Sequence, residues 1–483
     1  MKKILFILLV FVVASCSKDF EEMNTNTKSP VAVSGETLFT NAQKNLADQL
    51  ASVNVNTNIW KLWARYITET TYVDEANYDI VNRTQPGNAF RTYYRNVLRD
   101  LQESAVIMEE ATFAAPEDIA AKANRLAIVE ILNVYAYQRL VDMFGDIPYT
   151  EALKVDETTT PKYDDAEGIY SDLFSRLNTA IAELDDANGS FGSQDIYYGG
   201  DVAMWKKFAN SLKLKMAITV ADVSSLNPKA AAEAAVTDGV ITDASENGTL
   251  VYLGASPNTN PLYLDLVASG RHDFVATADI IDTMKFYVDP RMDLYYDLAP
   301  GATTQLGGAY GYSNAYDLYS HLTATIEEPT FESMLISVEE VEFYLAEAIE
   351  RGWAVGGTAE DHYNAGITAS IMYWGGDAAA ATAYLADANV AYTTAPGANW
   401  KEKIGIQSWL ASFNRGFIGY TTMRRLDFHT FPQPPQARTD DGSTPVRYTY
   451  PIDEQTLNGA NLDAAAAAIG GDNMLTKLFW DAN

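Results

Sequence analysis

Apolar residues recur at helical spacing through most of the chain. In the segment 89–112, Phe90, Tyr93, Val97 and Leu101 fall close to one face of a helix. Equivalent patterns predict further helices over 38–67, 117–144, 165–187, 201–222, 229–238, 275–287, 337–351, 358–373, 399–414 and 453–467. The chain is therefore predicted to be mostly α-helical.

Polar residues and glycine mark several ends of these helices. Asn88 is a candidate N-cap for the helix over 89–112, and Asp164 or Asp165 is a candidate for the helix that follows. Asp201 is likewise a candidate N-cap, for the predicted helix over 201–222. Gly145 predicts the end of the helix over 117–144, because glycine readily adopts the left-handed conformation found after helices.

Antiparallel pairs of such helices are typical of a tetratricopeptide-type scaffold. The expected pairs are 89–112 with 117–144, 165–187 with 201–222, and 337–351 with 358–373. No strict 34-residue repeat is visible, so any repeats are degenerate. We expect one domain over residues 37–483, and such a scaffold does not by itself name a function.

Long irregular inserts separate the predicted helices. They are rich in Gly, Asn, Tyr, Pro and Asp, and loops of this length in a compact protein are usually functional or disordered. The inserts cover residues 189–200, 241–274, 289–334, 376–397 and 429–451. Residues 295–320 carry six tyrosines, which favours an ordered surface over a disordered segment.

The first sixteen residues, MKKILFILLVFVVASC, have the pattern of an export signal. Two lysines precede eleven apolar residues, a run that is too short to span a bilayer. VASC resembles a lipobox, which predicts a signal peptide over 1–15 and lipid on Cys16. Residues 16–36 are polar and predict a tether. The alternative is an ordinary secretory signal with a chance cysteine, but Cys16 is the only cysteine in the chain. A single cysteine also excludes an internal disulfide.

The balance of charges limits the possible partners. The chain has 34 basic and 64 acidic residues, with a formal charge of −30. Binding to nucleic acid or to anionic lipid requires clusters of Lys and Arg, and the sequence contains none. We therefore expect no nucleic-acid partner, and membrane contact through lipid alone.

No catalytic or metal-binding motif is present in the sequence. His272, His321, His362 and His429 do not follow the spacing of a metal site. There is no G-x-S-x-G elbow and no phosphate loop. With 64 acids, no carboxylate pair can be singled out for glycoside hydrolysis. We expect neither catalysis nor a cofactor or metal.

Two adjacent arginines, Arg424 and Arg425, allow two interpretations. They could bind a ligand carboxylate, because the guanidinium fork matches a carboxylate in geometry. The favoured interpretation is that they pair with acidic side chains inside this acidic protein.

Several motifs together resemble one known family. The segment YQRLVDMFGDIPYTEA at 137–152 resembles the "FGDIPYTEA" signature of SusD/RagB-type nutrient-binding outer-membrane lipoproteins. The other motifs follow in the family's order. They are YGGD at 198–201 with WKKFANSLKLK at 205–215, DPRM at 289–292, SVEEVEFYLAEA at 337–348 with RGW at 351–353, YNAGITAS at 363–370, RYTYP at 447–451 and FWD at 479–481.

This resemblance implies a SusD-like helical scaffold and a protein on the outer leaflet of the outer membrane. It implies a lipoprotein that caps a SusC-like, TonB-dependent transporter and helps capture a nutrient, without enzymatic activity. The nutrient is most often an oligosaccharide, and peptides are bound by some relatives. The family's ligand residues lie in variable loops, so none is transferred to this chain.

Candidate ligand residues come instead from the loops themselves. Tyrosine rings can stack on the apolar faces of sugars while polar side chains bind the hydroxyls. The candidates are Tyr72, Tyr78, Arg271, Asp273, Tyr310, Tyr312, Tyr316 and Tyr319. The alternative for each is a buried residue that anchors its loop. Capture of peptides, a lipid-anchored hydrolase and a purely structural lid for the transporter are alternative functions.

Overall fold

The computed structural model describes residues 33–482. The predicted signal peptide, Cys16 and most of the predicted tether therefore lie outside the described residues. The first helix, α3 (Gly35–Ala51), begins two residues before the expected domain start, because the Ser34 hydroxyl accepts a hydrogen bond from the Thr37 amide. Over residues 33–482, no helix combines the length and apolarity that crossing a membrane requires.

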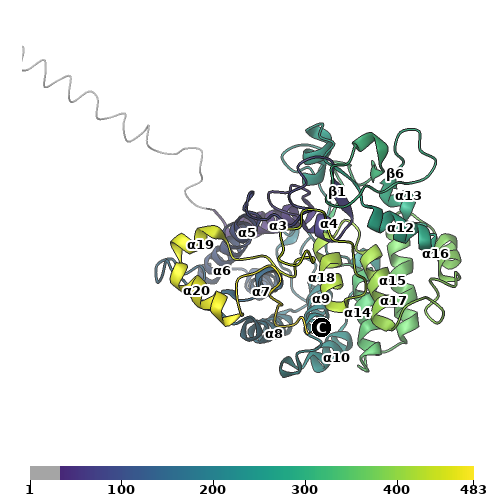
Figure 1. Ribbon diagram of the computed structural model, residues 1–483. Helices are drawn as coiled ribbons and strands as arrows, with labels where there is room; N and C mark the ends of the chain where they lie inside the picture. The colour runs from purple at the N-terminus through teal and green to yellow at the C-terminus, as the bar shows by residue number, and fades with distance from the viewer. Residues whose placement is uncertain (1–32, 483) are drawn as a thin grey trace, which may run out of the picture.

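Helices dominate the described chain, and the strands are short (Figure 1). The other long helices are α6 (Arg99–Glu110), α7 (Pro116–Phe144), α8 (Ala166–Glu183), α9 (Val202–Thr219), α10 (Pro228–Asp238), α12 (Ala278–Tyr287), α14 (Val338–Glu350), α15 (Ala359–Tyr373), α17 (Trp400–Ala411), α18 (Gly416–Leu426) and α20 (Gly459–Ala468). The short helices are α4 (Trp60–Trp63), α5 (Gln85–Arg91), η1 (Thr92–Leu98), η2 (Gly192–Gln194), η3 (Ser224–Leu226), η4 (Ala244–Glu246), α11 (Pro261–Tyr263), η5 (Leu264–Ala268), α13 (Met292–Tyr295), η6 (Tyr316–Leu318), α16 (Ala378–Leu385) and α19 (Ile452–Leu457). The prediction of a mostly α-helical fold is confirmed.

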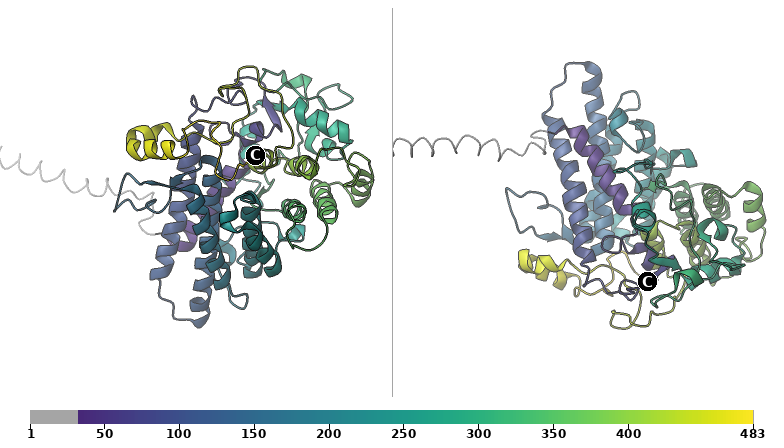
Figure 2. Two further views of the ribbon diagram at one scale, coloured as in Figure 1. Left: turned by 60° about the horizontal axis from the view of Figure 1, so that its bottom comes forward. Right: turned by 90° about the horizontal axis from the view of Figure 1, so that it is seen from above.

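The predicted pair of helices at 337–351 and 358–373 is confirmed, because α14 packs along α15. The helices of the other two expected pairs also touch each other, but each packs more extensively on a different helix. Helix α6 packs most extensively on α3, and α8 packs on α7 (Figure 2). Gly35 explains the first case, because a Cβ there would lie 2.9 Å from the Ser104 carbonyl oxygen. The small residue lets α3 and α6 approach closely.

Several predicted helix ends are confirmed by side-chain caps. The Asp165 carboxylate accepts a hydrogen bond from the Gly168 amide at 2.8 Å, and Asp201 caps α9 in the same way. Gly145 ends α7 with a φ of +85°. Local polar and small residues therefore set these boundaries, as the sequence indicated.

Other predicted helix boundaries are wrong. The helix expected over 38–67 breaks after α3, because Asn54 and Asn58 hydrogen-bond to nearby main-chain groups and compete with the helical pattern. Asn88 is not a cap; it lies inside α5, and its amide donates to the Asn56 carbonyl. The helix expected over 453–467 breaks at Asn458, and α16 lies in an insert expected to be irregular.

Charged side chains are buried and paired between α14 and α18. The Arg425 guanidinium makes two hydrogen bonds to the Glu347 carboxylate, at 2.7 and 2.9 Å. Arg415 contacts Glu339 at 3.0 Å and Glu340 at 2.8 Å. The prediction that the paired arginines bind internal acids is confirmed for Arg425. Arg424 behaves differently and is described below.

Within residues 33–482, four two-stranded antiparallel sheets join segments that are distant or separated in the chain. They pair β1 (Ile67–Glu69) with β5 (Phe274–Ala276), β2 (Ile147–Pro148) with β3 (Tyr163–Asp164), β4 (Thr249–Leu250) with β8 (Ser333–Met334), and β6 (Tyr296–Asp297) with β7 (His321–Leu322). In the first pair, Glu69 lies opposite Phe274. The end of β1 and the start of β5 therefore carry their flanking loops to the same edge of the molecule.

Candidate functional site

Three distant segments meet beside the β1–β5 pair. The Thr70 amide donates to the Asp273 carbonyl at 2.8 Å, and the Thr70 hydroxyl donates to the His272 carbonyl at 2.8 Å. The Asn314 amide donates to the Thr70 carbonyl at 3.1 Å. These bonds join residues 70–78, 271–274 and 308–321, which contain all the candidate ligand residues.

The exposed candidates form what we call the tyrosine platform. Tyr72 is 72% exposed and Tyr312 is 54% exposed. Arg271 is exposed, while Asp273, Tyr316 and Tyr319 are half-buried. The tyrosine platform is defined here as Tyr72, Arg271, His272, Asp273, Tyr312 and Tyr316. Two of its three tyrosines, Tyr72 and Tyr312, are exposed to solvent.

The backbone of Tyr72 departs from ordinary geometry. Its φ is 56°, in the left-handed region that residues with a Cβ rarely adopt. Non-glycine residues in this conformation cost free energy and cluster at functional sites. The rest of the loop compensates for this cost and keeps the ring exposed.

A stack of three rings forms one side of the platform. The Tyr316 ring lies parallel to His272, with centroids 4.2 Å apart, and to His321, with centroids 4.5 Å apart. Burial raises the pKa of the Tyr316 hydroxyl to about 12, with smaller contributions from Glu327 and Asp297, so it is protonated at neutral pH. The role of His321 was missed in the sequence, because nothing in the spacing of the histidines indicates stacking.

Arg271 and Asp273 form an exposed ion pair on the platform. The Arg271 Nε lies 2.5 Å from the Asp273 carboxylate. This hydrogen bond, followed by the charge of Asp273, raises the pKa of Arg271. Because the ion pair uses the Arg271 Nε, the two terminal nitrogens of the Arg271 guanidinium can donate hydrogen bonds to a ligand.

Tyr78 and Tyr310 lie beneath the platform. Both are buried, and the Arg65 guanidinium lies 3.6 Å from the centroid of the Tyr310 ring. Arg65 also donates a hydrogen bond to the Tyr78 hydroxyl at 2.7 Å. These two tyrosines therefore match the alternative of a buried loop anchor. They support the exposed rings and are not themselves accessible.

Asn77 connects the platform to the loop over 429–451. Its amide donates to the Gly311 carbonyl at 2.8 Å, and its side-chain oxygen accepts from the Gln436 amide at 2.8 Å. Gly311 has a φ of +76°, and a Cβ there would lie 2.6 Å from Pro434. The close approach of these segments fixes Tyr312, the next residue along the chain.

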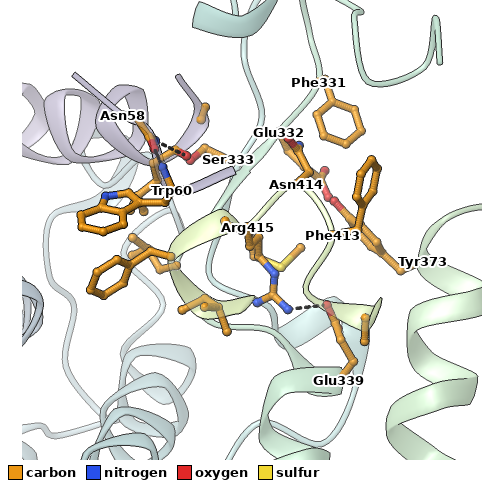
Figure 3. Close-up of a pocket in the computed structure, with 18 of the residues that line it drawn as sticks. Asn58, Trp60, Phe331, Glu332, Ser333, Glu339, Tyr373, Phe413, Asn414 and Arg415 are labelled. Carbon is orange, nitrogen blue, oxygen red and sulfur yellow. Dashed lines mark hydrogen bonds and ion pairs between the residues drawn. The ribbon is translucent and has the colours of Figure 1, made fainter. Parts of the chain in front are cut away.

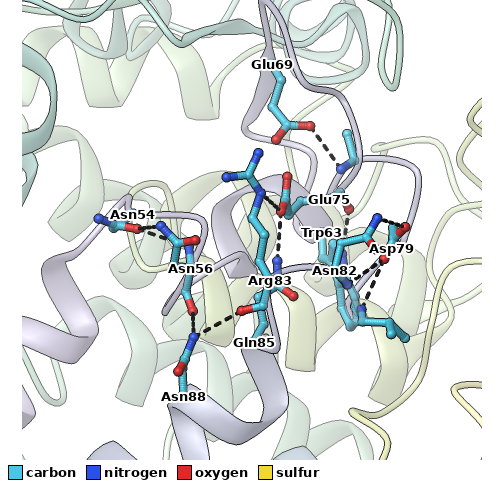
Figure 4. Close-up of polar contacts among 12 residues, drawn as sticks. Asn54, Asn56, Trp63, Glu69, Glu75, Asp79, Asn82, Arg83, Gln85 and Asn88 are labelled. Carbon is cyan, nitrogen blue, oxygen red and sulfur yellow. Dashed lines mark hydrogen bonds and ion pairs between the residues drawn. The ribbon is translucent and has the colours of Figure 1, made fainter.

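Two buried carboxyl groups, Glu69 and Glu75 (Figure 4), flank in sequence the loop over 70–74 that carries Tyr72. Glu69 accepts a hydrogen bond from the Ala76 amide, and Glu75 contacts Gln85 at 2.8 Å and Arg83 at 2.6 Å. Burial, together with the neighbouring Glu75, raises the pKa of Glu69. Burial also raises the pKa of Glu75, whereas Arg83 opposes the change. Both acids are buried and hold the loop.

A separate hollow lies between the helical layers, lined by Trp60, Tyr373 and Phe413 (Figure 3). Its volume is about 40 Å³, which is enough for water but not for a sugar ring. Arg415 points across it to Glu339 and is already neutralised. This hollow is therefore a weaker candidate for ligand binding than the platform. Over residues 33–482, no three His, Cys, Asp or Glu side chains are arranged to hold a metal ion.

Comparisons with known proteins agree with the architecture. A family model described as "Starch-binding associating with outer membrane" (SusD-like) matches residues 25–451. A chitin-binding protein of known structure is 25% identical, covers 93% of this chain and 100% of its own, and superposes with a TM-score of 0.80. Curated proteins gave no significant match.

Two further solved structures are similar. A chitin-binding SusD homologue from Flavobacterium johnsoniae is 26% identical, with 92% of this chain and 98% of that chain covered and a TM-score of 0.76. A SusD homologue from Bacteroides uniformis is also 26% identical, with 92% and 99% covered and a TM-score of 0.79. The family model spans most of the chain, and the helical scaffold matches over nearly its full length. The chain therefore belongs to the SusD-like family.

Proposed function

We propose that this chain is a cell-surface lipoprotein that captures a glycan on the tyrosine platform and passes it to a SusC-like, TonB-dependent transporter. The observation that carries the proposal is the exposure of Tyr72 and Tyr312 on loops that hydrogen bonds join to the segment of Arg271 and Asp273. Exposed rings next to hydrogen-bonding side chains suit the alternating apolar and polar surfaces of a sugar. The chitin-binding relatives support a glycan as the ligand.

The platform is well supported for such a role. Arg65, Tyr78 and Tyr310 form a packed layer below it, and Asn77 joins it to a second loop. A binding surface that is already ordered loses little conformational entropy when a ligand binds. Asp273 is held by Arg271, while Glu69 and Glu75 are buried, so we propose binding without catalysis.

Membrane attachment is the second part of the proposal. Lipid on Cys16 would hold the protein at the outer membrane, residues 16–34 would act as the tether up to the start of α3, and the chain from Gly35 onward would form one domain. Each buried CH2 group contributes about 0.8 kcal/mol, so several acyl chains make an anchor that does not dissociate in practice. Replacing Cys16 with Ala should move the protein to the soluble fraction. Retention in the membrane without the transporter would contradict the anchor.

Affinity electrophoresis of residues 17–483 on a panel of polysaccharides, including chitin oligosaccharides, tests the binding role. The double variant Tyr72→Ala/Tyr312→Ala should bind about 30-fold more weakly, from roughly 1 kcal/mol per ring. Phe286→Ala is the matched control, because Phe286 is an exposed ring at the end of α12. Equal retardation of the double variant and the wild type would reject the platform as the site.

Capture of cationic peptides is the second candidate, favoured by the formal charge of −30. Long-range attraction between the acidic surface and a cationic peptide would be screened by salt. Binding that weakens steeply as salt rises, with no retardation on any glycan, would replace the glycan proposal with this one.

A further inference from the structure

Arg424 and Arg425 are adjacent in sequence but have different environments. Arg425 is paired with Glu347, as described above. Arg424 is buried, and its terminal nitrogens donate to the Asp142 carbonyl at 2.9 Å, the Val446 carbonyl at 2.8 Å and the Thr421 hydroxyl at 3.1 Å. Within residues 33–482, no carboxylate lies within ion-pair distance of Arg424. Its Nε also lacks a hydrogen-bond acceptor.

Arg424 lines a cavity of about 270 Å³. The cavity lies between the end of α18, the loop over 429–446 and the chain near residues 477–481. Its buried lining residues include Arg65, Tyr420, Arg424 and Asp481. Exposed residues at its edge include Thr430 and Lys477. The volume is close to the lower end of small-molecule pockets, which run from about 300 to 1,000 Å³.

The other two permanently charged basic side chains that line this cavity have direct carboxylate partners, whereas Arg424 does not. Arg65 contacts Asp279 at 3.4 Å, and Lys477 contacts Asp481 at 3.6 Å. His429 and Asp427 lie at the exposed edge. Three permanently charged basic side chains therefore lie at the cavity together with the carboxylates of Asp427 and Asp481 in the lining and Asp279 beside Arg65.

A buried charge without a direct ion pair is costly, so other groups must hold Arg424 in place. Its guanidinium lies 4.2 Å from the centroid of the Tyr420 ring and 4.8 Å from that of Trp480. These rings and the two carbonyls keep the charge buried. A ligand carboxylate would supply the direct ion pair that Arg424 lacks.

We propose that this cavity is a second binding site, which takes a small organic carboxylate no larger than a monosaccharide acid. Arg424 provides the positive charge at its base. The hydroxyls of Thr430, Ser443 and Thr444 can bind polar groups of the ligand, and Phe431 offers an apolar wall. The site is distinct from the tyrosine platform, because Arg65, Tyr78 and Tyr310 lie between them.

Calorimetric titration of residues 17–483 tests the proposal. The probes are D-glucuronate and N-acetylglycine, which represent a sugar acid and an amino-acid derivative, and D-glucose is the neutral control. We expect heat from at least one acid, which identifies the source of the carboxylate, and none from glucose. No binding of either acid up to about 10 mM, corresponding to less than about 3 kcal/mol, would overturn the proposal.

Two variants locate the site. Arg424→Lys keeps the charge but loses the planar fork, so binding of the acid should weaken by about tenfold or more. Thr430→Trp should block the entrance without touching Arg424, whose hydrogen bonds hold the fold. Arg99→Lys is the control, because Arg99 is an exposed arginine on α6.

Circular dichroism and thermal unfolding show whether each variant folds. If Arg424→Lys is unfolded, the Thr430→Trp variant decides the question by itself. Acid binding that is unchanged in a folded Thr430→Trp variant and in a folded Arg424→Lys variant would place the ligand elsewhere and reject this site. Loss of binding in either folded variant, with Arg99→Lys unchanged, would support it.

Discussion

The space between α14 and α18 and the tyrosine platform use the same residue types in opposite ways. In the first region, Arg425 and Glu347 are both buried and form a two-bond ion pair. On the platform, Arg271 and Asp273 pair in contact with water. Buried pairs are costly to break, whereas exposed pairs contribute little to stability. The difference separates residues that hold the fold from residues that are available for a ligand.

The largest effect should come from breaking the buried pair. Glu347→Gln removes the buried carboxylate that pairs with Arg425 and also contacts Arg351 at 2.9 Å, and should lower the free energy of unfolding by about 3–5 kcal/mol. Urea unfolding at neutral pH measures this change. Asp273→Asn is the comparison on the platform and should cost less than about 1 kcal/mol. Similar losses of unfolding free energy in Glu347→Gln and Asp273→Asn would contradict this difference between the buried pair and the exposed pair.

A smaller effect should come from the layer beneath the platform. Tyr310→Leu removes the ring that lies over Arg65 and should cost about 2 kcal/mol in unfolding free energy. Tyr310→Phe is a close control, because the Tyr310 hydroxyl has no hydrogen-bond partner. Glycan binding should weaken in Tyr310→Leu and persist in Tyr310→Phe. If both variants lose the same stability, the hydroxyl has a role that the contacts do not account for.

The buried acid Glu69 should make stability depend on pH. Its folded pKa is raised above the ordinary value of 4.5, so the unfolded chain releases this proton first as pH increases. The free energy of unfolding should therefore fall as pH rises above 4.5, by about 1.4 kcal/mol for each pH unit until the folded pKa of Glu69 is reached. Glu69→Gln, which resembles the protonated acid, should flatten this dependence between about pH 5 and pH 8. An unchanged slope in urea unfolding would show that Glu69 ionises normally.

The smallest effect concerns a partly exposed pair on the helical scaffold. His362 on α15 lies 2.6 Å from Glu342 on α14, and this hydrogen bond is the main cause that raises the pKa of His362. The stabilisation is present below the ordinary pKa of 6.5 and disappears as pH rises through the raised value. Glu342→Gln should therefore cost about 0.5–1 kcal/mol near pH 6 and almost nothing near pH 9. Equal losses at the two pH values would argue against the charged pair.

Sequence patterns predicted the features that depend on neighbouring residues. The caps at Asp165 and Asp201, the end of α7 at Gly145 and the internal pairing of Arg425 needed only local spacing or overall charge. The break between α3 and α4 was missed, although Asn54 and Asn58 carry the physical reason for it. The prediction of one helix over 38–67 followed the apolar spacing and did not take these two asparagines into account.

The composition of the platform could not be predicted in the same way. Tyr310 and Tyr312 are two positions apart, yet one ring is buried under Arg65 and the other is exposed. The stack of His272, Tyr316 and His321 depends on contacts between separate loops. Which tyrosine faces water is decided by these long-range contacts, which no local pattern records.

The hydrogen bonds of Thr70 have a consequence for the order of folding. They join residues about 200 and 245 positions apart along the chain, counted from residue 70 to residues 272–273 and to Asn314. Contacts between distant positions form slowly, because a long loop must close before they can contribute. The platform therefore assembles only after most of the chain has been synthesised and folded. A truncated or partly folded molecule lacks it, so ligand binding would report on the completeness of the chain.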